Sequence, residues 1–184
     1  MAAELDKSQL DTWASAGVDL ARMAVRSWEA AAHYYSVSPA VVGLMPFTYF
    51  VKWANCGHSL CSQSPELARA YFQASPGTMS VLRSRHIESW ANLGSSLYKG
   101  TWKSRALSCK FFEASPVLLK SLTLADLERF AALLRAISRR SYDHAFECLT
   151  LGRKLYPLLG ENKGTFIDLA STLANTNWRQ VKSF

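Results

Sequence analysis

The feature that most constrains the fold is a segment that occurs three times along the chain. Each copy has an aromatic pair, then two intervening residues, then a Ser-Pro pair, and another aromatic residue fourteen positions after the proline. The copies are 34–39 with Trp53, 71–76 with Trp90, and 111–116 with Phe130. A repeat of 37 to 40 residues is typical of stacked helical arrays, in which each unit buries its apolar face against its neighbours.

Apolar residues with helical spacing surround the aromatic residue that ends each copy. Positions i, i+3, i+7 and i+10 lie on one face of a helix. Four segments show this spacing: Leu10, Trp13, Gly17 and Leu20; Phe50, Trp53, Gly57 and Leu60; Ile87, Trp90, Gly94 and Leu97; Leu127, Phe130, Leu134 and Ile137. The alternation typical of strands is absent over any useful length. We therefore expect an all-α fold of stacked helical hairpins.

The repeat also predicts how its core is packed. We expect Trp53, Trp90 and Phe130 to be buried at equivalent positions, each near the aromatic pair of its own unit. Glycine is a poor helix former. The glycine four residues after each tryptophan is therefore expected to make room for a neighbouring helix or for the Trp ring of the adjacent unit.

The Ser-Pro pairs predict a helix boundary inside each unit. Serine is a favoured N-cap, proline suits the first helical position, and proline disfavours the α conformation of the residue before it. We expect Ser38, Ser75 and Ser115 to be N-caps, each pair ending one helix and beginning a short one. A capping-box-like pattern at 123–126 predicts the start of the helix that carries Phe130.

Helix breakers divide the chain into units. Breaks are expected at 62–65 and 99–101, and the loss of the Ser-Pro pair after Arg140 is typical of a terminal unit. We expect one helical-repeat domain over residues 1–184, stacked as a right-handed α–α superhelix or a compact bundle, with units at about 9–25, 26–62, 63–99, 100–140 and 141–184. The last helix is expected to run from 165 to about 178.

The segment between Leu20 and Trp28 contains no helix breaker. Analogy with the other copies predicts a turn or kink there. One long helix over about 9–37 is the alternative that local sequence chemistry allows.

The net charge of +7 is unevenly distributed. Residues 1–60 contain four Lys/Arg against five Asp/Glu, whereas residues 61–184 contain seventeen against nine. A basic surface attracts acidic proteins, nucleic acid or anionic lipid. The candidate partner-binding residues lie at predicted helix ends and loops, where cations also suit the helix dipole: Arg83, Arg85, Lys103, Arg105, Arg139 and Arg140.

The sequence shows neither a membrane-spanning segment nor a signal peptide. No apolar run reaches the length of a membrane span, and the acidic N-terminal segment differs from a signal peptide. We therefore expect a cytoplasmic protein with no membrane partner, whose four cysteines are reduced thiols.

Two segments contain residue types that can bind a metal or act as a nucleophile. Cys56, His58 and Cys61 have loose zinc-ligand spacing, but no second ligand pair follows and both cysteines fall on core-like positions. His144 and Cys148 share a helix face, but no orienting third group or oxyanion donor accompanies them. No phosphate loop or hydrolase motif occurs. We therefore expect no enzyme activity, no cofactor and no metal.

The repeat resembles the helical region of bacterial proteins that carry a von Willebrand factor A domain and work beside MoxR-type AAA+ ATPases. The likeness covers about residues 10–140. It rests on Trp13-Ala-Ser-Ala-Gly17, Trp53-Ala-Asn-Cys-Gly57, Trp90-Ala-Asn-Leu-Gly94 and the Ser-Pro pairs. The chain lacks the Asp-x-Ser-x-Ser metal-adhesion motif and a Walker A motif. The resemblance implies protein–protein scaffolding in a bacterial cell, with an AAA+ ATPase or a von Willebrand A domain protein as partner.

Two functions are consistent with these observations. The first is a non-catalytic protein-interaction or scaffold module. The alternative is a nucleic-acid-binding helical repeat that uses the basic residues along one edge. Salt dependence separates the two, because phosphate binding by several Lys/Arg weakens steeply as salt increases.

Overall fold

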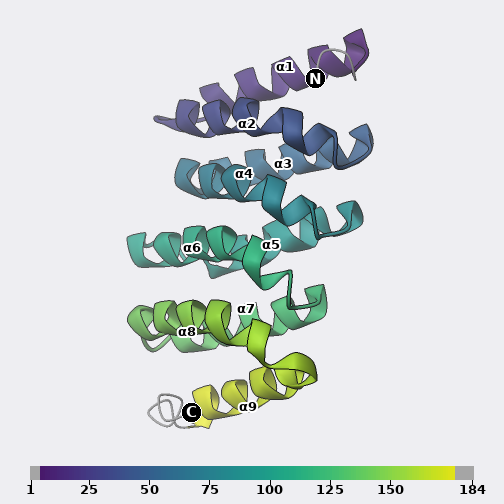
Figure 1. The fold of residues 1–184 in the computed structure, drawn as a ribbon. Helices are drawn as coiled ribbons and strands as arrows, with labels where there is room; N and C mark the ends of the chain where they lie inside the picture. The colour runs from purple at the N-terminus through teal and green to yellow at the C-terminus, as the bar shows by residue number, and fades with distance from the viewer. Residues whose placement is uncertain (1–4, 177–184) are drawn as a thin grey trace.

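The computed structural model describes residues 5–176, and within this range every regular element is helical (Figure 1). The expected all-α fold of stacked helical repeats is confirmed. The α-helices of the described part are α1 (Lys7–Arg22), α2 (Ser27–Val42), α3 (Phe47–Gln63), α4 (Pro65–Met79), α5 (Ile87–Leu97), α6 (Trp102–Leu118), α7 (Leu124–Ser138), α8 (Tyr142–Leu155) and α9 (Lys163–Thr176). Short 3-10 turns occur at Ser84–His86, Tyr156–Leu158 and Gly160–Asn162.

The helices form two layers that run the length of the stack (Figure 1). The odd layer contains α1, α3, α5, α7 and α9, each in contact with the next along the layer. The even layer contains α2, α4, α6 and α8, which contact one another in the same way. Each helix from α1 to α8 therefore packs against its own layer and against the facing layer, as expected for stacked hairpins, and α9 packs on α7.

A turn separates α1 from α2, so the alternative of one long helix over 9–37 is wrong. Arg26 has a φ of 69°, in the left-handed region that a helix interior excludes. The Ser27 hydroxyl lies 2.8 Å from the Ala21 carbonyl oxygen and 2.7 Å from that of Ala24. This buried serine therefore ties the end of α1 to the start of α2.

The three aromatic residues at the end of the repeat copies form the core. Trp53, Trp90 and Phe130 are all fully buried, which confirms the repeat alignment. The Trp53 ring stacks on Tyr34 with a centroid distance of 5.3 Å, and Trp90 stacks on Tyr71 at 4.8 Å. These two tryptophans therefore pack on the aromatic pair of their own unit, as expected.

The aromatic pairs also join successive units. In the first two pairs the leading tyrosine donates a hydrogen bond to the preceding odd-layer helix. Tyr34 Oη donates to the Trp13 carbonyl at 3.1 Å, and Tyr71 Oη donates to the Trp53 carbonyl at 3.3 Å. In the next unit Phe111 has no hydroxyl, and Ser108 Oγ donates to the Gly94 carbonyl at 2.6 Å instead.

The repeated glycines make room for the second residue of the following aromatic pair. A Cβ on Gly57 would lie 2.0 Å from Phe72 Cζ, and a Cβ on Gly94 would lie 2.1 Å from Phe112 Cζ. Gly17 has the same relation to Tyr35. The expectation of close approach is confirmed, although the ring that fills the space belongs to the next even-layer helix and is not a tryptophan.

The prediction that Ser38, Ser75 and Ser115 cap short helices is wrong. All three serines lie inside the long even-layer helices, each followed by an internal proline. Each hydroxyl donates to the carbonyl four residues earlier, at 2.5, 2.7 and 2.8 Å. Each serine side chain is thus hydrogen-bonded to the preceding turn of its own helix, and that helix continues only about one turn beyond the proline.

The prolines produce a repeated bend instead of a boundary. Proline lacks the N–H that would bond the carbonyl four residues earlier, so the helix bends and continues. The bends of α4 and α6 pack together, since a Cβ on Gly77 would lie 3.1 Å from Pro116 Cβ. The unit is therefore a two-helix hairpin with a bent even-layer helix, and the expected three-helix unit is wrong.

The capping pattern at 123–126 is confirmed. Thr123 Oγ1 accepts a bond from the Asp126 N–H at 3.2 Å, and Asp126 Oδ2 accepts one from the Thr123 N–H at 3.3 Å. This capping box begins α7, whose Phe130 ring packs 5.1 Å from the ring of Tyr156. The last helix, α9, starts two residues earlier than expected, and the predicted end near residue 178 lies outside the described residues.

Candidate partner-binding site

The structure places the six candidate cations on two edges of the stack (Figure 1). Lys103 and Arg105 lie in the first turn of α6, and Arg139 and Arg140 directly follow α7. These four belong to the edge at which the even-layer helices begin, at the left in Figure 1.

Arg83 and Arg85 lie at the opposite edge, in the connection from α4 to α5. The whole of α5 separates them from Lys103, and an eleven-residue helix is about 16 Å long. The single ridge expected from the sequence is therefore not formed. Arg85 Nε instead donates to Nε2 of the adjacent His86 at 3.2 Å.

We name the edge at which the even-layer helices begin the basic edge. It combines the four expected cations with two further ones, at the turns before α2 and α6, and with two exposed tryptophans. Its members are Arg26, Trp28, Lys99, Trp102, Lys103, Arg105, Arg139 and Arg140.

Carboxylates pair with part of this basic edge. Glu29 accepts from Arg26 at 2.8 Å and lies 3.4 Å from Arg69 of α4. Glu66 of α4 lies 3.5 Å from Arg105 of α6. The Arg69–Glu29 and Arg105–Glu66 pairs connect successive even-layer helices. Because they are partly exposed, each stabilises the fold only slightly.

Glu66 remains ionised over the physiological range. The Ser64 hydroxyl donates to the Glu66 carboxylate, and this bond lowers the pKa of Glu66. The positive charges of Arg105 and Arg26 lower that pKa further. The basic edge therefore contains fixed negative positions as well as positive ones.

Several cations of the basic edge have no acidic neighbour. Within the described residues Lys99, Lys103 and Arg139 form no ion pair. The Lys103 ammonium lies 5.6 Å from the centroid of the Trp102 ring, a cation–π contact. This surplus of positive charge is available to an acidic ligand.

Two tryptophans project from the same edge. Trp28, in the first turn of α2, is 63% exposed, and Trp102, the first residue of α6, is 68% exposed. Sequence reasoning missed both as site residues. The signal that identifies them is their position: each stands near the start of an even-layer helix, away from the repeat positions of Trp13, Trp53 and Trp90. Exposed Trp beside Arg and Lys is the composition typical of interaction hot spots.

Cys56, His58 and Cys61, which have loose zinc-ligand spacing in the sequence, are instead packed or hydrogen-bonded within the fold. Cys61 is buried, and burial raises the pKa of the half-buried Cys56 thiol to about 11. His58 Nε2 lies 2.8 Å from the Ala16 carbonyl oxygen, so this nitrogen donates a bond that joins α3 to α1. Within the described residues no three His, Cys, Asp or Glu side chains are grouped to hold a metal ion.

The pair considered for nucleophilic chemistry is also unsuited to it. Burial raises the pKa of Cys148 to about 12, so the thiol remains protonated at neutral pH. A thiol reacts through its thiolate. Cys148 is therefore a half-buried thiol of α8 that packs against the core.

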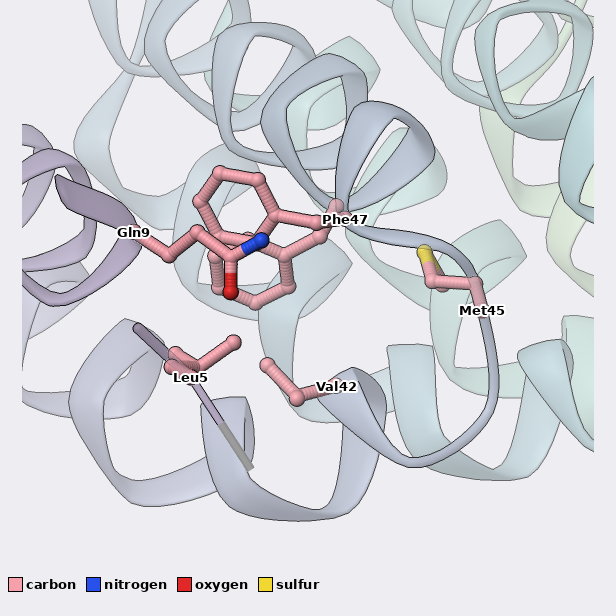
Figure 2. A pocket seen from close by; sticks show the side chains of 6 residues that line it. Leu5, Gln9, Val42, Met45 and Phe47 are labelled. Carbon is pink, nitrogen blue, oxygen red and sulfur yellow. The ribbon is translucent and has the colours of Figure 1, made fainter. Parts of the chain in front are cut away.

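An apolar hollow lies beside the start of α1 and the corner between α2 and α3 (Figure 2). Its volume is about 250 Å³, and Leu5, Val42, Met45 and Phe47 contribute to its wall. The polar side chain in this wall is Gln9, whose Oε1 already accepts the Asp6 N–H of the α1 capping box at 3.1 Å. The hollow therefore presents no acid, base or nucleophile.

Comparison of the chain with models of known families, with curated proteins and with solved structures finds no match. No helix in the described part of the chain combines the length and apolar content needed to span a bilayer. The fold and the basic edge thus define the class, an all-α helical-repeat protein with a charged, tryptophan-bearing edge.

Proposed function

We propose that this chain is a non-catalytic protein-interaction module whose basic edge binds an acidic surface of a partner protein. One observation carries the proposal: Trp28 and Trp102 are largely exposed on the same edge that presents cations without acidic partners. Exposed tryptophan supplies large apolar contact area, and the surrounding Arg and Lys supply charge-assisted bonds.

The mixed charge of the edge favours a protein partner over nucleic acid. Glu29 and Glu66 lie between the cations of α2, α4 and α6, and a phosphate backbone following this edge would meet both carboxylates. A folded protein surface can instead place its own charges opposite each sign. Nucleic acid remains the second candidate, because Trp102 beside Lys103 combines a stacking ring with a cation.

The resemblance of the repeat supplies the first partners to test. An AAA+ ATPase or a protein with a von Willebrand A domain is the natural probe. We propose a cytoplasmic site of action without a cofactor or a metal, in keeping with protonated thiols at Cys56, Cys109 and Cys148.

The test reverses cations that have no ion pair in the fold. The edge variant is Lys99→Glu, Lys103→Glu and Arg139→Glu, and the matched control at the opposite edge is Arg83→Glu, Arg85→Glu and Lys120→Glu. Both variants change the net charge by the same amount. Binding is measured against the candidate partners, a poly-glutamate peptide and a fluorescent dT20 oligonucleotide at several salt concentrations.

The edge variant should lose at least tenfold in affinity for the protein and poly-glutamate probes, with an unchanged melting temperature, while the control retains affinity. Trp102→Ala should weaken binding to the protein partner as well. Equal losses in the edge variant and the control would contradict the proposal. Tight binding to dT20 alone, falling steeply with salt, would support the nucleic-acid alternative.

A further inference from the structure

Two exposed asparagines occupy the same repeat position on the odd layer. Asn55 of α3 and Asn92 of α5 each stand two residues after the core tryptophan of their helix, and both are exposed. Asparagine is a poor residue for a helix interior, because its amide competes for backbone bonds. Within the described residues neither carboxamide forms a hydrogen bond, so intramolecular structure does not require asparagine at these positions.

Both carboxamides line surface hollows of the odd layer. A hollow of about 280 Å³ between α3 and α5 has Asn55 and Asn92 in its wall. A second hollow of about 240 Å³ between α1 and α3 also has Asn55 in its wall. The first hollow therefore has both carboxamides in its wall, and the second lies on the other side of Asn55. We call these two neighbouring hollows the groove.

The charges along this groove are nearly balanced. Lys52 of α3 and Glu88 of α5 form an ion pair at 3.2 Å across the first hollow, and Asp19 contributes a carboxylate to the second. The resulting excess of one negative charge opposes binding of phosphate groups. The remaining polar lining consists of neutral amides, hydroxyls and one histidine, which suit an uncharged polar ligand.

We propose that this groove binds an extended peptide segment of a partner protein through the main chain of the peptide. A carboxamide has both a donor and an acceptor group, so Asn55 and Asn92 can each pair with one N–H and one C=O of the segment. Neighbouring packed helices are about 8–10 Å apart, and one three-residue turn of an extended chain in polyproline II conformation rises about 9 Å and returns its main-chain groups to the same side. The two carboxamides therefore match a peptide at intervals of three residues.

This binding surface is distinct from the basic edge. It lies on the face of α1, α3 and α5, whereas Trp28 and Trp102 belong to α2 and α6. The charge reversals at Lys99, Lys103 and Arg139 leave it unchanged, so the two proposals succeed or fail separately.

The experiment uses a displayed library of random twelve-residue peptides. Peptides are selected on the full chain with counter-selection on the Asn55→Ala, Asn92→Ala double variant, and selected sequences are synthesised for affinity measurement. Gln73→Ala is the matched control, because Gln73 is an exposed carboxamide inside α4 of the even layer. Each selected peptide is also made with single N-methylated main-chain amides, and dT20 is measured in parallel.

Each asparagine substitution should weaken peptide binding about tenfold, in line with the loss of two hydrogen bonds to the main chain. N-methylation at two positions three residues apart should have the same effect, and Gln73→Ala should leave affinity unchanged. The melting temperature of the asparagine variants should stay the same or rise, because alanine is the better helix former. Failure to select any peptide, equal binding by the double variant, insensitivity to N-methylation, or a preference for dT20 in the groove would each overturn the proposal.

Discussion

Substitution of Gly94 by alanine tests the packing that joins successive units. In an exposed helix this change stabilises by about 1 kcal/mol, because glycine loses more backbone freedom on folding. In this fold the new Cβ would lie 2.1, 2.5 and 2.6 Å from atoms of the Phe112 ring. That ring is fully buried, 5.4 Å from Trp90 and 5.6 Å from Tyr71, so it has little room to move.

The clash should outweigh the helix propensity of alanine. Overpacking a core costs about 1–3 kcal/mol, and this contact is far inside van der Waals distance, so the upper end applies. After the propensity gain of about 1 kcal/mol, Gly94→Ala should destabilise by about 2 kcal/mol. For a chain of this size the melting temperature should fall by about 4–8 °C.

Urea and thermal unfolding followed by circular dichroism measure this change. Gly43→Ala is the matched control, because Gly43 is exposed at the end of α2 and a Cβ there would lie 3.9 Å from the Ala40 carbonyl oxygen, an ordinary contact. The Gly43→Ala variant should be as stable as the parent or more stable. Phe112→Leu should make Gly94→Ala less harmful in a double-mutant cycle. A Gly94→Ala variant that melts higher than the parent would refute the packing argument.

Two further predictions concern buried polar groups. Ser75→Ala should cost about 1–3 kcal/mol by urea unfolding, because Trp53 Nε1 donates to Ser75 Oγ at 2.7 Å and would lose its partner. Ser115→Ala should cost less, since the indole of Trp90 has no such bond to lose; equal losses would contradict this reasoning. Burial raises the pKa of Cys109 to about 11 and of Cys148 to about 12. Because the fold favours the protonated thiols, their contribution to folding stability is fully present below about pH 8.5 and is lost as pH rises through those values. The melting temperature should therefore fall between pH 8.5 and 11, and a flat profile would contradict the raised pKa of these thiols.

The repeat predicts the fold because its spacing reports packing directly. A fourteen-residue offset between proline and aromatic residue recurs because each unit returns its aromatic residue to the same buried position, even though α3, α5 and α7 differ in length. Trp53, Trp90 and Phe130 were therefore assigned to the core from spacing alone. The capping box at Thr123 was equally local, since both of its bonds lie within four residues.

The errors arose where tertiary contacts override a local preference. Ser38, Ser75 and Ser115 have the sequence of a helix start, but the buried even-layer helices continue through them because the serine bonds back and the bend packs against the next helix. Spacing along the chain likewise could not assign Arg83 and Lys103 to opposite edges. That assignment requires knowing that α5 runs from one edge to the other.

A repeat also provides an internal comparison that separates packing from binding. Residues that recur for packing are buried, as the tryptophans of α3 and α5 are. Asn55 and Asn92 recur on the surface, where an intrahelical asparagine costs helix stability and forms no bond within the described fold. Trp28 and Trp102 differ from these asparagines, because they are large apolar residues that lie outside the core repeat positions and yet are largely exposed. Neither pattern stabilises the stack, so both are best explained by contacts that another molecule supplies.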